Sequence, residues 1–212
     1  VALLNQDERP CVLFSHEFMG MPTVLQAIVE GQEQFRTVFH AHECTTARYL
    51  VEGHIGHDSV FYNVLDRAQS EGLYAADVFG DLDHLFRHAL VKRAHLCDGV
   101  IAVGDRTRDE LRFLDAAFDG VPIDLVYNGL PSVEVEFDKK RVSRDRLADH
   151  AEVLVGRRPD VLLTHVTRPV ISKGLWRDLK LCHELDDRFS KNNRTGVLYI
   201  LTSAAGTRRP RH

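Results

Sequence analysis

Apolar residues are arranged along this chain in two patterns, short continuous runs and helical spacing, which predict alternating strands and helices. Short apolar runs rich in β-branched or aromatic residues, each stopped by polar residues, are typical of buried strands. Such runs lie at 11–14, 35–39, 98–103, 122–127, from 161 onward and at 197–202. Apolar residues at helical spacing predict helices at about 22–31, 45–51, 81–95, 105–114, 141–155 and 175–189. This order implies an α/β fold with parallel sheets and right-handed crossovers.

Two stretches interrupt the pattern. Residues 53–80 are rich in Gly, His and Asp, and we expect them to form the least regular part of the chain. Residues 131–140 are charged with little apolar periodicity, and we expect a linker there, giving domains 1–135 and 136–212. The second domain would hold only about two strands, fewer than a stable sheet normally has. The chain is therefore expected to be a fragment, with both domains incomplete.

Composition narrows the class of protein. The 212 residues are 44% hydrophobic and 27% charged, which is typical of a soluble globular protein. A formal net charge of −4 argues against nucleic acid or an anionic membrane as partner. No apolar run approaches the roughly 20 residues of a membrane helix. The four cysteines form no CxxC pair, and together with the missing signal peptide they favour a reducing, cytoplasmic location.

The clearest candidate chemistry follows the apolar run that begins at Val161. Arg168 comes after this run, Lys173 follows five residues later, and a helical pattern starts at Leu175. Ligands of open α/β sheets bind beyond the carboxyl ends of the strands, often against the N-terminus of the next helix. Two fixed cations at that place suit a diphosphate. The alternative is a pair of solvated cations on an ordinary strand-to-helix loop.

Polar residues also follow the first predicted strand. His16 and Glu17 come directly after it, where a histidine can bind a sugar hydroxyl and a glutamate can orient it or bind an acceptor. The alternative is a loop pair with local hydrogen bonds. Asn128 and Gly129 follow the strand at 122–127, and on their own they most simply make a turn.

A denser cluster follows the second predicted strand, with His40, His42, Glu43 and Arg48. Histidine is a good zinc ligand, but His40 and His42 share a face only if the strand continues, and no third ligand has the expected spacing. We therefore predict no metal site here. His84 and His88 are also one helical turn apart; without the glutamate of an HExxH motif, they are expected on an exposed helix face.

Taken together, six ordered segments between about residues 12 and 176 resemble the glycogen and starch synthases. His16-Glu17-Phe-Met-Gly is similar to the His-Glu-Trp motif of that family. Val38–Leu50 is similar to the stretch in which a histidine and Gly-Arg-Tyr-Leu follow a strand in the animal and fungal enzymes. The other matching segments are Phe61-Tyr62-Asn63, Arg93-Ala94, Asn128-Gly129-Leu130, and Arg168 with Lys173-Gly174 at the family's five-residue offset.

This resemblance implies the GT-B fold, in which two Rossmann-like domains face a cleft. It implies transfer of glucose, with retention, from ADP-glucose or UDP-glucose to a growing α-glucan, without a cofactor or metal. Residues 1–135 would belong to the acceptor-side domain and 136–212 to the donor domain. Arg168 and Lys173 would neutralise the leaving diphosphate, and His42 would lie near the transferred sugar. The remaining matched positions would contribute to substrate binding: His16, Glu17, Arg48, Asn128 and Gly129.

Departures from the family keep other readings open. Phe18 replaces the usual tryptophan, Ala47 replaces the glycine before the arginine, and the glycine-rich donor loop and later glutamate pair are absent. We therefore expect little transferase activity from this chain alone. One alternative is another GT-B glycosyltransferase, sucrose-synthase-like or acting on surface polysaccharide. A second is a non-catalytic module that binds a nucleotide or phosphosugar, and a homo-oligomer is compatible with each reading.

Overall fold

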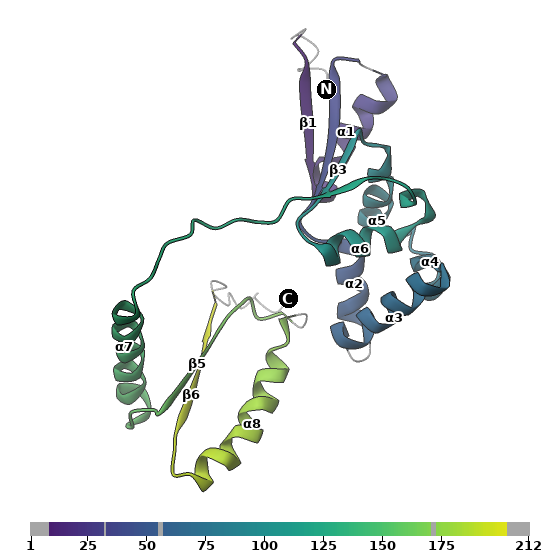
Figure 1. The fold of residues 1–212 in the computed structure, drawn as a ribbon. Helices are drawn as coiled ribbons and strands as arrows, with labels where there is room; N and C mark the ends of the chain where they lie inside the picture. The colour runs from purple at the N-terminus through teal and green to yellow at the C-terminus, as the bar shows by residue number, and fades with distance from the viewer. Residues whose placement is uncertain (1–8, 32, 55–56, 171–172, 203–212) are drawn as a thin grey trace, which may run out of the picture. The chain divides into compact units, whose positions relative to one another are not determined.

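The computed structural model describes residues 9–31, 33–54, 57–170 and 173–202. The chain divides into two compact units, Val1–Leu130 and Pro131–His212. This division lies five residues before the boundary expected from the sequence. Both units contain parallel sheets with helices between the strands, so the α/β class is confirmed (Figure 1).

The first unit is built on a four-stranded parallel sheet in the order β1-β2-β3-β4. Its strands are β1 (Cys11–His16), β2 (Phe35–Ala41), β3 (Gly99–Ala102) and β4 (Ile123–Leu125). The register places His16 beside His40, and His40 beside Ile101. Since all strands run the same way, their carboxyl ends share one edge. The polar residues that follow β1 and β2 therefore meet at that edge.

Helices supply the rest of the first unit's core. They are α1 (Glu17–Glu30), α2 (Thr45–Gly53), α3 (His57–Glu71), α4 (Ala75–Phe79), α5 (Phe86–Val91), the 3-10 turn η2 (Lys92–Leu96), α6 (Asp105–Leu114) and the 3-10 turn η3 (Ala116–Phe118). Alternate residues of β2 are buried, and Phe39 packs with Met21 of α1 and Phe61 of α3 in one cluster. Burial of one such side chain stabilises the fold by roughly 1.5–3 kcal/mol. On the other face of the edge strand β1, Val12 and Phe14 stay more than half exposed.

The expectation that residues 53–80 are irregular was wrong, because most of this stretch forms α3 and α4. The buried residues of α3, Phe61, Leu65 and Ala68, have helical spacing. The Gly, His and Asp residues that suggested a loop stand mainly outside this buried stripe. The first helix also begins earlier than predicted, at Glu17, so Pro22 lies inside α1 and not in its first turn.

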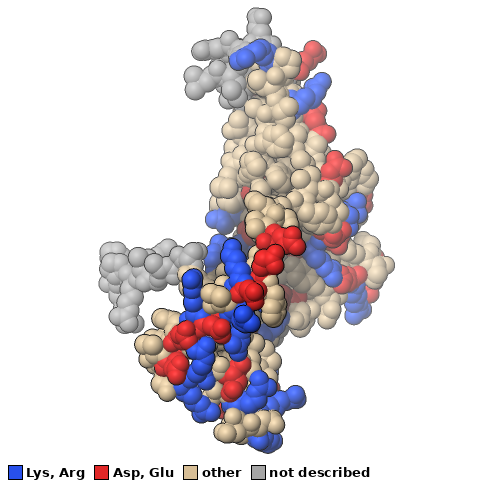
Figure 2. Space-filling model, turned by 60° about the vertical axis from the view of Figure 1, so that its left-hand side comes forward, with Lys and Arg blue, Asp and Glu red and all other residues tan. Residues whose placement is uncertain are grey.

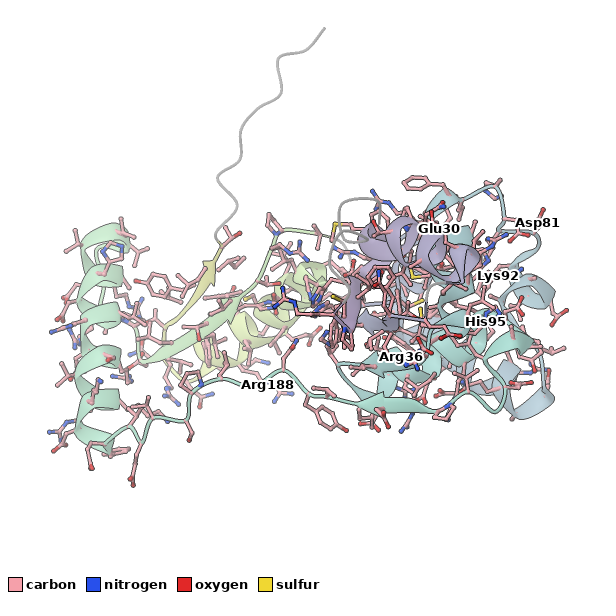
Figure 3. The ribbon with its side chains drawn as sticks, turned by 90° about the horizontal axis from the view of Figure 1, so that it is seen from above. Glu30, Arg36, Asp81, Lys92, His95 and Arg188 are labelled. Atoms are coloured by element: carbon pink, nitrogen blue, oxygen red, sulfur yellow. The ribbon has the colours of Figure 1, made fainter. Side chains whose placement is uncertain are left out.

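The helix expected at 81–95 is shorter than predicted, and His84 and His88 do not share an exposed helix face. His84 lies in the turn before α5, and His88 is buried, with its Nδ1 3.1 Å from the Thr46 hydroxyl. Burial lowers the pKa of His88. Lys92 and His95, labelled in Figure 3, belong to η2, where Lys92 pairs with Asp115 at 3.1 Å. His88 is thus a packed core residue, and the predicted exposed face was wrong.

In its described residues, the second unit contains the parallel strands β5 (Val161–Val166) and β6 (Gly196–Leu201) and the helices α7 (Phe137–Val155) and α8 (Leu175–Lys191). The predicted linker is shorter than 131–140, because α7 begins at Phe137. Among the described hydrophobic residues of this unit, only Ala148 and Ala151 are buried. Figure 2 shows Lys and Arg interspersed with Asp and Glu on the surface of this unit. One ion pair there joins Arg158 to Asp145 at 3.4 Å. Its core is therefore thin.

None of the described helices is both long and apolar enough to cross a bilayer. All four cysteines are free thiols, and the pKa of the buried Cys44 is raised by desolvation.

Candidate functional site

The connection between β1 and α1 is a tight junction without a loop. His16 ends the strand, Glu17 begins the helix, and Glu17 has a φ of 55°, a left-handed conformation that is rare for residues with a side chain. The buried Ser15 hydroxyl donates to the Glu17 carbonyl at 2.8 Å. A Cβ on Gly20 would lie 2.6 Å from the Ser15 Cα, so the helix can approach the strand this closely only with glycine at that position. Backbone strain of this kind is often found at functional sites.

The Glu17 carboxylate holds the turn after β2. Its Oε1 accepts hydrogen bonds from the backbone N–H groups of His42 and Glu43, the latter at 2.7 Å. The side chain is buried, and its Oε2 has no hydrogen-bond partner among the described residues. Desolvation raises the pKa of Glu17 to about 7, although the two backbone hydrogen bonds oppose this shift. Glu17 therefore fixes the backbone that carries His42, a role that the sequence did not reveal.

Three histidines converge at the carboxyl edge of the sheet. His16 Nδ1 lies 2.9 Å from His42 Nε2, and the rings of His40 and His42 are 4.1 Å apart between centroids. One ring nitrogen of each residue lies within 4.8 Å of the others. Burial, with the neighbouring His42 and His16, lowers the pKa of His40. A third partner for His40 and His42 was not apparent from the sequence, because His16 stands on the neighbouring strand and not at a fixed spacing.

Arg48 is engaged by carboxylates. On α2, its guanidinium lies 2.5 Å from Glu43 and 3.4 Å from Glu52. A substrate phosphate or carboxyl group would have to compete with both partners. Arg48 instead fastens the turn after β2 to α2, beside the histidines.

A second buried acidic residue, Glu110, lies near the turn after β2. The Tyr62 hydroxyl donates to Glu110 Oε1 at 2.6 Å. Glu110 is 7% exposed, and desolvation raises its pKa to about 7. Tyr62 belongs to the Phe61-Tyr62-Asn63 segment of the family resemblance, and this bond gives it a structural role between α3 and α6.

In the second unit, Arg168 and Lys173 occupy the connection from β5 to α8, as the sequence predicted. Both are exposed, and within the described residues neither side chain pairs with a carboxylate. Gly174 has a φ of 70° and precedes α8 directly, and His165 of β5 lies 2.5 Å from Asp178 in the first turn of α8. This pair fastens the strand to the helix whose N-terminus follows the two cations.

Asn128 and Gly129 lie exposed after β4 in a segment without regular structure, so the turn expected there from the sequence was wrong. A cavity of about 690 Å³ in the second unit lies at the amino end of β6, lined by Phe189 and Gly196 among others. Neither Arg168 nor Lys173 lines it, so it is not the predicted diphosphate site.

No protein-family model matches the chain, and no curated protein matches its sequence.

Proposed function

We propose that this chain is part of a retaining GT-B glycosyltransferase resembling the glycogen and starch synthases, and that its second unit binds the diphosphate of a nucleotide-sugar. The observation that carries the proposal is the position of Arg168 and Lys173. Both cations stand exposed between the carboxyl end of β5 and the N-terminus of α8. That place is where open α/β sheets bind phosphates.

The chemistry of this place suits a departing diphosphate. A guanidinium can bind two phosphate oxygens at once, and an ammonium adds a compact charge. The backbone N–H groups at the start of α8 and the helix dipole favour the same anion. Charge that develops on the leaving group during transfer would be stabilised by groups already in place, which is the most effective form of electrostatic catalysis.

The first unit supports the proposal through His42 and His16. The backbone N–H of His42 binds the Glu17 carboxylate and its Nε2 lies 2.9 Å from His16 Nδ1, so we assign the contact with the sugar to the carbonyl oxygen of His42. A carbonyl oxygen or a neutral imidazole suits the positive charge that develops on the sugar ring. In this reading Glu17 is a positioning residue, and glucan and nucleotide-sugar are the substrates.

A non-catalytic nucleotide or phosphosugar-binding role is the second candidate. The observation that favours it is the thin second unit, which has two strands in its described part. A catalytic donor site would need further groups, whereas binding of a diphosphate needs only the two cations and the helix N-terminus.

Calorimetric titration of the folded chain with ADP-glucose, UDP-glucose and GDP-mannose tests binding of the diphosphate, which both candidate functions require. Arg168→Ala/Lys173→Ala should weaken binding of the preferred donor by at least about a hundredfold, because hydrogen bonds to charged groups contribute about 1.5–3 kcal/mol each and the double variant removes both groups. The matched control, Arg188→Ala/Lys191→Ala, removes the same charges at the other end of α8, where Arg188 is labelled in Figure 3. The control should bind like the wild type. A folded chain that binds no donor, or loses affinity equally in both variants, contradicts the proposal.

Inorganic pyrophosphate in the same titration separates the two candidates. A donor that binds much more tightly than pyrophosphate supports recognition of the sugar and base, as a glycosyltransferase requires. Equal affinity for pyrophosphate and all three donors favours a simple diphosphate-binding module.

A further inference from the structure

We propose that His16, His40 and His42 form a binding site for a divalent transition-metal ion, with Zn²⁺ as the best match. The three residues lie at the carboxyl ends of two neighbouring parallel strands, and each offers one ring nitrogen within 4.8 Å of the others. This inference does not depend on the proposed glycosyltransferase.

The fold brings the three rings together for two reasons. His40 lies in β2, and His42 follows the last residue of that strand in a bend that brings its ring to 4.1 Å from the His40 ring, measured between centroids. The parallel register sets His16 directly beside His40, on the same face of the sheet. Ring centroids lie 5.3 Å apart for His16 and His40 and 5.2 Å apart for His16 and His42.

The spacing is close to what a metal requires. At Zn–N distances of about 2.0–2.1 Å, tetrahedral geometry separates two ligand nitrogens by roughly 3.4 Å. The His16–His42 contact of 2.9 Å is slightly shorter, and the widest separation of the three is at most 4.8 Å. His16 and His42 are exposed, so rotation of their side chains can open the short contact and close the wide one.

Two further observations point to a ligand. The Nε2 of His40 is buried and has no hydrogen-bond partner among the described residues, a costly arrangement that a bound ion can relieve. The backbone at His42 is also fixed, because Glu17 and the Glu43–Arg48 pair hold the turn. Ligands held by neighbouring groups in this way need less rearrangement on binding.

The three nitrogen ligands determine which metal ions the site can bind. Imidazole nitrogen suits Zn²⁺, Co²⁺, Ni²⁺ and Cu²⁺, whereas Mg²⁺ and Ca²⁺ prefer oxygen ligands. Three protein ligands leave a fourth position for water or a substrate atom, which is the pattern of catalytic and not of structural zinc sites. The site would therefore hold an ion that remains open to an external ligand.

Titration of the tag-free full chain with Zn²⁺ by calorimetry, and with Co²⁺ by visible spectroscopy, tests the site. We expect one ion per chain and the visible bands of Co²⁺ in a low-symmetry nitrogen site, with no comparable binding of Mg²⁺. His16→Gln and His42→Gln should each weaken Zn²⁺ binding at least about a hundredfold, since loss of even an indirect partner costs roughly 10–100-fold. Both positions are exposed, so these variants should fold, which circular dichroism checks.

His84→Gln is the matched control, because His84 is an exposed histidine of the same unit outside the cluster. It should bind Zn²⁺ like the wild type. Unchanged affinity in folded His42→Gln, an equal loss in His84→Gln, or Mg²⁺ binding as tight as that of Zn²⁺ would overturn the proposal.

Discussion

The buried carboxylate of Glu17 accepts a hydrogen bond from the backbone N–H of Glu43 at 2.7 Å, which joins the turn after β1 to the turn after β2. The same oxygen also accepts from the N–H of His42. A residue at a strained strand–helix junction thus sets the geometry of the neighbouring strand end.

Replacing Glu17 by alanine should lower the free energy of unfolding by roughly 1–3 kcal/mol, because two backbone N–H groups lose their acceptor. Glu17→Gln keeps an acceptor oxygen without a buried charge, and it should cost clearly less. Urea denaturation measures both. Glu33→Ala, at an exposed position, is the control and should stay within about 0.5 kcal/mol of the wild type. Equal losses in Glu17→Ala and Glu33→Ala would refute the bridging role.

Glu110 should make the protein less stable as the pH rises. Its pKa is raised from 4.5 to about 7 in the folded chain, so its contribution is fully present below pH 4.5 and is lost as the pH rises through about 7. A shift of this size corresponds to roughly 3 kcal/mol. Denaturation at pH 5 and pH 8 should show this decline, and Glu110→Gln should reduce it while keeping an acceptor for Tyr62.

Glu17 has a pKa raised to a similar value, so part of the decline should persist in Glu110→Gln. The double variant with Glu17→Gln should remove most of the remainder. A wild type equally stable at both pH values, or a Glu110→Gln protein with an undiminished decline, would contradict the assignment.

Gly20→Ala should destabilise the first unit by at least about 2 kcal/mol, since the new Cβ would lie 2.6 Å from a backbone atom of Ser15. Adding Ser15→Gly should restore stability only in part, because it removes the contact with Oγ at 2.9 Å but leaves the closest contact, with the backbone Cα. Gly53→Ala is the matched control: nothing lies within 4 Å of its Cβ position, and alanine favours the helix. Thermal unfolding that ranks the two variants equally would argue against the close junction.

The strands were the part of this fold that the sequence predicted best. All six apolar runs form strands, because a strand buried in a parallel sheet needs a continuous apolar stretch that few other structures require. Helices were harder to place. In α3 the buried stripe of Phe61, Leu65 and Ala68 is only one face, and the polar residues around it obscured the period.

The site was predictable only in part. Arg168 and Lys173 could be placed because both lie in a single strand-to-helix connection, which sequence order defines. The histidine cluster depends on which strands are neighbours and on their register, and a single sequence fixes neither. The bonds from Glu17 to the backbone of His42 and Glu43 depend in addition on the left-handed conformation of Glu17. The conformational preferences of a glutamate do not predict that conformation.

The order β1-β2-β3-β4 has a consequence for how the first unit is made. Each new strand pairs with the strand made just before it, on the same advancing edge of the sheet. During synthesis, β2, β3 and β4 can therefore each pair with a strand that has already been made. Domains generally fold from the N-terminal end during synthesis. The histidine cluster draws only on the β1 and β2 ends of this sheet. Strand pairing in this unit can thus follow the order of the chain, with the candidate metal ligands on the two strands that are translated before β3 and β4.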